Sequence, residues 1–171
     1  MSHRVAAGNV ALVNDQSPLD HARGLYYDEN GGIFRYVLAE DAALAVLDVL
    51  CYATNYGASD AHQGASARNQ GEVTNTSTSA IDGTLATVNA CAGVAMGTVT
   101  DNYFAYAQVS GLASAKTDGG VSKGNSLVVD GGNTPNGQFD TAAAGEEHAV
   151  AGYALADDVS TTVSCVLRCI L

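Results

Sequence analysis

The sequence predicts an all-β fold, a small β-barrel or sandwich of short antiparallel strands. The main observation is alternation: in YFAYAQVSG, residues 103–111, successive side chains form two distinct sets on opposite faces, which is the period of a strand. The second observation is that clusters rich in Gly, Asn and Asp, which favour tight turns, lie between the predicted strands at 28–32, 117–125 and 130–137. Short strands separated by such turns are typical of barrels and sandwiches.

The same two patterns place the individual elements. The 103–111 strand is expected to stop at Ser110 and Gly111, and the strand that begins at 84 is expected to bend at Gly93. One stretch differs, because strong helix formers and acidic residues predict a short helix from about Glu40 to Val46. The strands are predicted at 9–13, 33–38, 48–53, 84–96, 103–111, 126–130, 148–155 and 162–171.

Length and composition predict one domain with a core of small side chains. A chain of 171 residues buries roughly 70% of its unfolded surface in a single core. It contains 29 Ala and 19 Gly but only three Phe and no Trp, so close backbone approach must replace bulky side chains. We assign 1–24 as an N-terminal arm or edge segment and 25–171 as one barrel domain. The long polar loop at 54–82 is interpreted as an excursion away from the barrel, with a hairpin at 72–79; function and simple flexibility both remain open for it.

The charge and the absence of sorting signals exclude several classes of protein. Eighteen acidic and seven scattered basic residues give a net charge of −11, which argues against nucleic-acid binding because phosphate contacts need clustered Lys or Arg. The first 16 residues are interrupted by Gly8, Asn9 and Asn14 and do not resemble a secretion signal. No window of 18 apolar residues predicts a membrane span. We therefore expect synthesis in a cytosol, with the four cysteines reduced.

Two short segments resemble each other and suggest an internal repeat. AGVAMG at 92–97 and AGYALA at 151–156 share a pattern of small residues, and each is followed at matched offset by a strand. The Gly in each copy would permit a bend or the close approach of a neighbouring strand. In this alignment Tyr106 corresponds to Cys165 and Val109 to Arg168, with the same inward and outward parity. Chance similarity in an Ala-rich chain is the alternative.

No catalytic motif is found, and every candidate for chemistry has a simpler interpretation. Glu146, Glu147 and His148 are neighbours that cannot all face one substrate on a strand, so a solvated turn is favoured. Loops 28–32 and 130–140 carry oxygen ligands that suit calcium, but turn formation is favoured over a metal site. GASAR at 64–68 lacks the closing Gly of a nucleophile elbow. The four histidines, which show no ligand spacing, are His3, His21, His62 and His148. We expect no enzymatic activity, no cofactor and no catalytic or metal-binding residue.

The cysteines near the C-terminus suggest a metal or redox site only at first sight. Cys165 and Cys169 lie on the same face of the predicted strand, in line with Val163, Leu167 and Leu171. Four strand residues separate them by roughly 13 Å, which is too far for a mutual disulfide or for joint zinc ligation. They are interpreted as small hydrophobic side chains facing the barrel interior. Cys51 and Cys91 are expected to be free thiols as well.

A longer pattern of residues resembles a known family. Tyr106 to Gly111, Gly120 to Leu127, Gly131 to Gly137, Gly152 to Leu155 and Val163 to Leu171 resemble the elements of the decoration, or capsid cement, proteins of tailed-bacteriophage heads. GGIFRYVLAEDAAL at 31–44 resembles the family's Gly-x-x-aromatic-Arg-Tyr-Val strand. One departure is Leu47, before Asp48, where a Gly would be more usual. The resemblance covers roughly 25–171.

This resemblance implies a virion structural protein that binds the outside of the head and stabilises the lattice of major capsid protein. It also implies self-association, with a trimer favoured, no nucleic acid or membrane as partner, and synthesis in the host cytoplasm. The alternative is a carbohydrate- or receptor-binding β-module; a β-barrel hydrolase is a weaker third interpretation. Contacts with the head are expected in 1–24 and 54–82, the parts least able to bury themselves.

Overall fold

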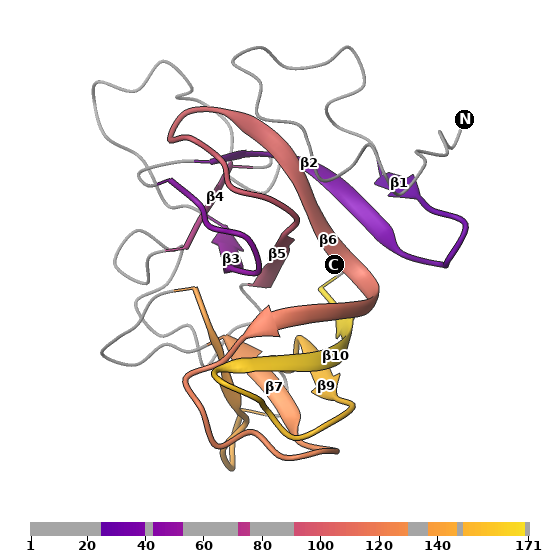
Figure 1. Cartoon of the computed structure of the whole chain (residues 1–171), viewed down its shortest axis with the longest axis vertical. Helices are drawn as coiled ribbons and strands as arrows, with labels where there is room; N and C mark the ends of the chain where they lie inside the picture. Colours follow the sequence, from indigo (N-terminus) through magenta and orange to yellow (C-terminus); the bar gives the residue numbers. More distant parts are fainter. Residues whose placement is uncertain are drawn as a thin grey trace.

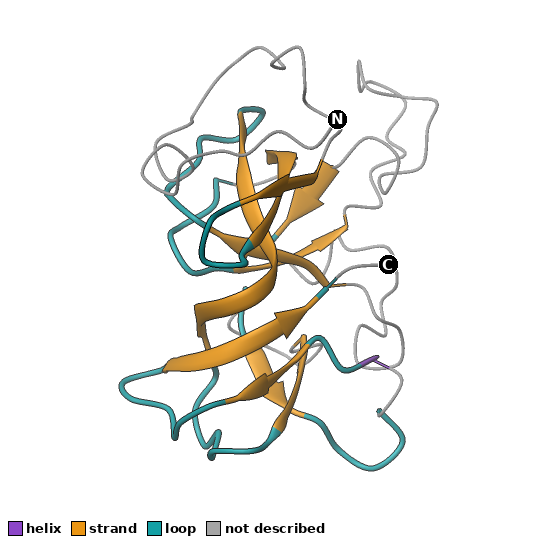
Figure 2. Ribbon diagram, turned by 90° about the vertical axis from the view of Figure 1, so that its right-hand side faces the viewer, coloured by secondary structure: helices purple, strands orange, loops and turns teal. Residues whose placement is uncertain are grey.

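The computed structural model describes residues 25–39, 43–52, 72–75, 91–129, 137–146 and 149–169. It is an all-β structure, as predicted, and its described part contains ten strands and no helix long and apolar enough to cross a bilayer (Figure 2). The strands are β1 (Leu25–Tyr27), β2 (Ile33–Ala39), β3 (Val49–Tyr52), β4 (Glu72–Thr74), β5 (Cys91–Ala95), β6 (Phe104–Lys116), β7 (Ser126–Val129), β8 (Phe139–Thr141), β9 (Gly152–Ala154) and β10 (Thr162–Arg168).

Five of these strands close into a barrel. Their order is β2-β4-β3-β5-β6, and β6 pairs back onto β2, so the ring has no free edge. The β2–β6 pairing runs from Ile33 opposite Ser110 to Leu38 opposite Phe104, with a register shift between Ile33 and Phe34. The β2–β4 pair is parallel, whereas the other pairs of the ring are antiparallel. Closure explains how such short strands can form a stable unit, because every strand has two partners.

Four of the other strands, together with the second half of β6, form a second layer, which we call the C-terminal sheet, while β1 pairs with β2. This sheet consists of residues 110–116 of β6 followed by β10, β9, β7 and β8. Thr117 forms a parallel bridge with Phe139, which brings β8 back beside the end of β6. Figure 1 shows β6 leaving the barrel, turning sharply, and continuing along β10. One strand is therefore shared by both units.

The length of β6 corrects the prediction that this strand stops at Ser110 and Gly111. Gly111 adopts φ of +95° and lies against Gly31 and Gly32, where an added Cβ would be 3.1 Å from the Gly31 carbonyl oxygen. The glycine thus permits a turn within the strand and close contact with the loop before β2. Residues 110–116 pair with β10, from Ser110 opposite Arg168 to Lys116 opposite Thr162. Pairing with a distant strand extends β6 past a local signal for termination.

The barrel interior is filled by one cluster to which all five ring strands contribute. Five of its members are alanines, so the interior is narrow, as the Ala-rich composition predicted. Tyr52 is the largest side chain in it, and its hydroxyl accepts a hydrogen bond from the Arg35 guanidinium. The buried members are Val37, Ala39, Leu44, Leu50, Tyr52, Val73, Ala92, Ala95, Val99, Ala105 and Ala107.

A second cluster packs the barrel against the C-terminal sheet. It combines side chains of β3, β5 and β6 that point out of the barrel with the inward face of β10, β9, β7 and β8. All four cysteines belong to it. Its buried members are Val49, Cys51, Cys91, Val94, Val109, Ala115, Val121, Leu127, Val129, Phe139, Ala151, Ala154, Val163, Cys165, Leu167 and Cys169.

The predicted helix at 40–46 is not supported by the residues that the structure describes there. Leu44 forms an antiparallel bridge with Val99, with both backbone hydrogen bonds at 2.9 Å, and Ala45 begins a turn closed by Asp48. Tertiary pairing outweighs helix propensity at this position, because propensity differences are only tenths of a kcal/mol per residue. Residues 40–42 lie outside the described ranges.

Part of the polar stretch at 54–82 belongs to the barrel wall. β4 pairs with both β2 and β3, and Val73 and Thr74 are fully buried, whereas the sequence predicted a hairpin that reaches away from the barrel. The remainder of this stretch lies outside the described residues, as do the arm at 1–24 and the predicted strand at 9–13.

The other predicted strands agree with the structure. β3, β5, β7, β9 and β10 each fall within a predicted range, and β2 extends one residue beyond its predicted range of 33–38. A bulge lies in β5 beside Gly93: Leu50 pairs with Gly93 and Cys51 with Cys91, so Ala92 is the extra residue. Residues 84–90 of the predicted 84–96 strand lie outside the described ranges. Two strands of the described residues were missed: β1, which pairs with β2, and β8, which follows a cluster of Gly and Asn.

The predicted repeat is confirmed for the role of its two glycines, but the prediction that corresponding side chains face the same way is wrong. An added Cβ would lie 2.6 Å from the Gln108 carbonyl oxygen at Gly93, and 2.5 Å from the Val166 carbonyl oxygen at Gly152. Both glycines therefore permit close approach of the following long strand. Val109, however, is buried, whereas its counterpart Arg168 is exposed, because the two hairpins pair in registers that differ by one residue.

Candidate interaction face and pocket

The outer face of the C-terminal sheet carries a row of four exposed or half-buried side chains, three of which are apolar. Leu112 on β6 pairs with Val166 on β10, Val166 pairs with Tyr153 on β9, and Tyr153 pairs with Ser126 on β7. Directly paired residues of adjacent strands project to the same side of a sheet, so these four form one row, which we call the exposed row. Leu112 is 71% exposed and Tyr153 is 40% exposed. Such a row in the middle of a sheet is a candidate contact surface.

The strands that carry the exposed row have no acidic residue, although the chain has a net charge of −11. This holds for β7, β9, β10 and residues 110–116 of β6. The adjacent strand β8 carries one, Asp140, opposite Val128 of β7. The Ser110–Arg168 and Ser114–Ser164 pairs flank Leu112 and Val166 on the same face. The face thus combines apolar and hydroxyl groups with a cationic edge. Another protein surface can approach it without the repulsion that the acidic exterior creates elsewhere.

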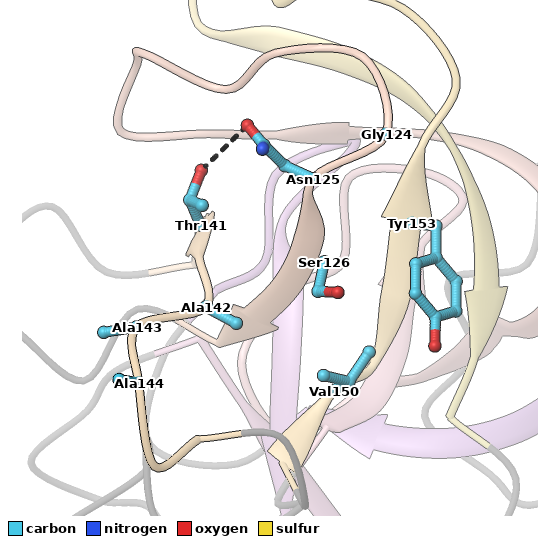
Figure 3. Close-up of a pocket in the computed structure, with 9 residues that line it drawn as sticks. All are labelled: Gly124, Asn125, Ser126, Thr141, Ala142, Ala143, Ala144, Val150 and Tyr153. Carbon is cyan, nitrogen blue, oxygen red and sulfur yellow. Dashed lines mark hydrogen bonds between the residues drawn. The ribbon is translucent and has the colours of Figure 1, made fainter.

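A pocket of about 550 Å³ lies at the β7 end of the exposed row (Figure 3). Ser126 and Tyr153 belong to both features. No charged side chain lines the pocket among the described residues. The lining residues are Gly124, Asn125, Ser126, Thr141, Ala142, Ala143, Ala144, Val150 and Tyr153.

The polar groups of the pocket are neutral and only partly engaged. Asn125 Oδ1 accepts hydrogen bonds from the Ser122 amide at 2.7 Å and from Thr141 Oγ1 at 3.4 Å, the contact drawn in Figure 3. No described residue makes a hydrogen bond with Asn125 Nδ2, Ser126 Oγ or Tyr153 Oη. A neutral ligand that offers several acceptors and an apolar surface for the Tyr153 ring would complement this lining.

Asp48 is a buried charge that the sequence did not reveal as important. It is 3% exposed, and its carboxylate accepts hydrogen bonds from Lys116 Nζ, from Asn75 Nδ2 at 2.7 Å and from the Ala45 amide at 2.7 Å. The three donors come from the end of β6, the residue after β4 and the turn before β3. A carboxylate held by this many donors ties these segments together, which is a structural role.

The structure confirms that Cys165 and Cys169 are buried in the core, and it adds a contact that spacing could not predict. Both side chains point into the cluster between barrel and C-terminal sheet, as expected for small hydrophobic groups. Cys169 Sγ lies 2.8 Å from Cys91 Sγ, although 78 residues separate them. Cys51 pairs with Cys91 across β3 and β5. All four are free thiols.

The environment of these thiols disfavours their ionisation. Burial, and then the neighbouring Cys91, raises the pKa of Cys165 to about 12. The same two causes raise the pKa of Cys51. A hydrogen bond with Cys91 and then burial raise the pKa of Cys169 well above its usual value. These groups therefore remain protonated at neutral pH.

The other candidates for chemistry are engaged in turns or lie outside the described residues. Asp28 Oδ1 accepts hydrogen bonds from the amides of Asn30 and Gly32, which is the predicted turn chemistry at 28–32. Asp140 Oδ1 accepts one from the Thr141 amide, and Glu146 one from the Ala143 amide. Within the described ranges no three His, Cys, Asp or Glu side chains gather as metal ligands would. The candidates outside these ranges are 64–68, 130–136, His3, His21, His62, Glu147 and His148.

Comparison with known proteins finds similarity among solved structures. No family model matches the sequence, and no curated protein matches it. The chain is similar in structure to the N base of the head fiber gp8.5 of bacteriophage phi29, with a TM-score of 0.49 and 14% sequence identity. The match covers 81% of this chain and 95% of that chain.

Proposed function

We propose that this chain is a structural virion protein that binds the outer surface of a tailed-phage head and stabilises the lattice of major capsid protein. The observation that carries the proposal is the exposed row, which lies on strands without an acidic residue. The resemblance of residues 25–171 to head decoration proteins, stated on sequence grounds, supports the same assignment. Binding to an assembled lattice stabilises it by mass action, so this role needs no catalytic chemistry.

Self-association would strengthen such a contact. The exposed row is small, and burial of one Leu or Tyr side chain contributes only about 1.5–3 kcal/mol. We propose that copies gather, with a trimer favoured, so that several equivalent faces engage the symmetric shell at once. Linked contacts raise the overall affinity without any new chemistry. Light scattering of the purified protein measures the assembly state.

A binding assay with purified heads tests the proposed function. We expect the protein to sediment with assembled heads and not with monomeric coat protein. Tyr153→Ser should weaken head binding about tenfold, because it removes an apolar group from the contact. Tyr27→Ser is a matched control, since Tyr27 on β1 is also 40% exposed but lies at the other end of the strand order. Equal affinity of the two variants would contradict the role of the exposed row.

The N-terminal arm provides a separate test. We predict from sequence that 1–24 and 54–82 contribute contacts with the head. Deletion of 1–20 should therefore reduce head binding while circular dichroism shows an unchanged β fold. If the deletion has no effect and Tyr153→Ser does, the contact lies on the C-terminal sheet alone.

A second candidate function is binding of a carbohydrate or a receptor glycan, and the pocket favours it. Its neutral hydroxyl and amide groups beside the Tyr153 ring have the chemistry that sugars require. A glycan array tests this function in the absence of any capsid protein. Binding that Ser126→Ala or Tyr153→Ser abolishes would support it, whereas head binding without any glycan signal would support the structural role alone.

A further inference from the structure

The four cysteines, spread over 119 positions of the sequence, meet in one buried cluster. Cys51 and Cys91 are paired across β3 and β5, and Cys165 and Cys169 lie on β10 and directly after it. The two sulfur atoms of Cys91 and Cys169 are 2.8 Å apart. A disulfide bond is about 2.05 Å long, so these sulfur atoms need to move by less than 1 Å to be joined.

We propose that Cys91 and Cys169 are an intramolecular disulfide site, which forms when the folded protein meets a peroxide or a comparable small two-electron oxidant. This inference concerns the chain's own chemistry and does not depend on the proposed function. The thiolate of one cysteine attacks hydrogen peroxide to give a sulfenic acid and hydroxide, which takes up the proton released by the thiol. The second thiol then displaces the hydroxyl group, forming the S–S bond and releasing water. In total, two thiols and one peroxide give one disulfide and two waters.

The geometry favours this pair over the other combinations. Cys165 and Cys169 are four strand residues apart, roughly 13 Å, and cannot be joined without distorting β10. Cys51 lies opposite Cys91 on the adjacent strand, but no described residue, Cys91 included, makes a hydrogen bond with its sulfur. Cys91 and Cys169 are the pair whose sulfur atoms are in contact. Cys51–Cys91 is the competing link, and the test must distinguish it.

The location of Cys91 and Cys169 determines which parts of the fold a disulfide between them would connect. Cys91 begins β5 in the barrel, and Cys169 follows β10, where its amide donates a hydrogen bond to the Val109 carbonyl at 2.9 Å. A bond between them would join the barrel covalently to the C-terminal sheet across their shared core. It closes a loop of 78 residues, and cross-links that close long loops restrict the unfolded chain strongly.

Burial determines how fast the link should form. Both sulfur atoms are inaccessible, and the raised pKa of Cys169 keeps that thiol protonated at neutral pH. Since the thiolate is the reactive form, oxidation should be slow near pH 7 and faster at higher pH. A small oxidant should act on the folded protein more readily than glutathione disulfide, which must contact the buried sulfur directly.

The experiment treats the folded, full-length protein with hydrogen peroxide and maps disulfide-linked peptides by mass spectrometry. The variant Cys51→Ala/Cys165→Ala keeps the proposed pair, and Cys91→Ala/Cys169→Ala removes it. We expect the wild type and the first variant to lose two hydrogen atoms, to yield a Cys91–Cys169 peptide, and to gain roughly 10 °C in Tm that reduction reverses. The second variant should show neither change.

Two outcomes would overturn the proposal. One is a cross-link in the folded wild-type protein that contains Cys51 or Cys165; the other is the survival of all thiols in the wild type after peroxide has oxidised a surface thiol of a reference protein. Peptide mapping of the wild type does not depend on the folding of any variant. Oxidation in urea provides the comparison, because an unfolded chain should give a mixture of pairings.

Discussion

Leu47 shows how one residue can carry backbone strain at a junction between elements. Its φ is +67°, in the left-handed region, which glycine adopts freely and a residue with a Cβ adopts only at an energetic cost. The resemblance to decoration proteins had marked this position, because a Gly would be more usual before Asp48. The Leu47 carbonyl accepts a hydrogen bond from the Lys116 amide at 3.0 Å, so tertiary contacts hold the strained conformation in place.

Leu47→Gly should therefore stabilise the protein slightly. Relief of the left-handed strain should raise the free energy of unfolding by about 1–2 kcal/mol. The greater flexibility of glycine in the unfolded chain should lower it by about 0.5–1 kcal/mol. We expect the free energy of unfolding in urea to rise by about 0.5 kcal/mol. Leu112→Gly is the control, because it places glycine in a strand and should cost about 1 kcal/mol. Equal losses in both variants would show that Leu47 is not strained.

The raised pKa of Cys165 predicts a loss of stability at alkaline pH. The ordinary thiol pKa is 9.0 and the folded value is about 12, so the stabilisation is complete below pH 9 and disappears as pH rises towards 12. Between pH 9 and 10 this residue alone should cost about 1 kcal/mol. Urea unfolding of the wild type and Cys165→Ala under reducing conditions at both pH values measures the difference. Identical slopes against pH would exclude a buried, neutral Cys165 thiol.

At the scale of elements, β6 determines the architecture, because it belongs to the barrel and to the C-terminal sheet. Two glycines on other strands permit close packing: one lets β5 approach β6, and the other lets β9 approach β10. Gly93 on β5 and Gly152 on β9 each lie against a backbone carbonyl that leaves no space for a Cβ atom. Alternation in the sequence revealed both long strands, whereas the continuation of β6 beyond Gly111 depends on β10, whose sequence lies some 50 residues further on.

Gly152→Ala should destabilise the protein by about 2–3 kcal/mol, because the methyl group would lie 2.5 Å from the Val166 carbonyl oxygen and one strand must shift. Gly32→Ala is the comparison: its methyl group would meet the Phe34 ring at 2.9 Å, and a side chain can move more easily than a backbone carbonyl. Thermal unfolding ranks the two variants. A smaller loss for Gly152→Ala would argue against close β9–β10 packing.

At the scale of the whole molecule, Asp48 connects segments that the sequence keeps far apart. Its carboxylate joins the end of β6, the residue after β4 and the turn before β3. Its side chain is 4% exposed, against 33% for that of Lys116. The buried Asp48 carboxylate therefore relies on its hydrogen-bond partners and not on water, while Lys116 remains partly solvated and its attraction partly screened.

Lys116→Met should reduce the free energy of unfolding by about 2 kcal/mol, because it leaves the Asp48 carboxylate buried without its cation. Lys123→Met removes the same charge from an exposed turn and should change stability by less than about 0.5 kcal/mol. Urea denaturation of both variants at low salt gives the comparison. Similar losses would mean that net charge matters and the contact with Asp48 does not.

The sequence by itself determined the all-β class, the positions of six strands and the small-residue core. Each of these depends on signals within a few residues: alternation, turn-forming clusters and composition. Only the tertiary structure decided that β2 and β6 close a ring, that residues 72–74 belong to the barrel wall, and that Leu44 bridges Val99 instead of joining a helix. It also brought Cys91 to Cys169 and aligned Leu112, Val166 and Tyr153. The physical reason is that partner and register are set by packing between strands distant in the chain, and a shift of one residue moves every side chain to the opposite face.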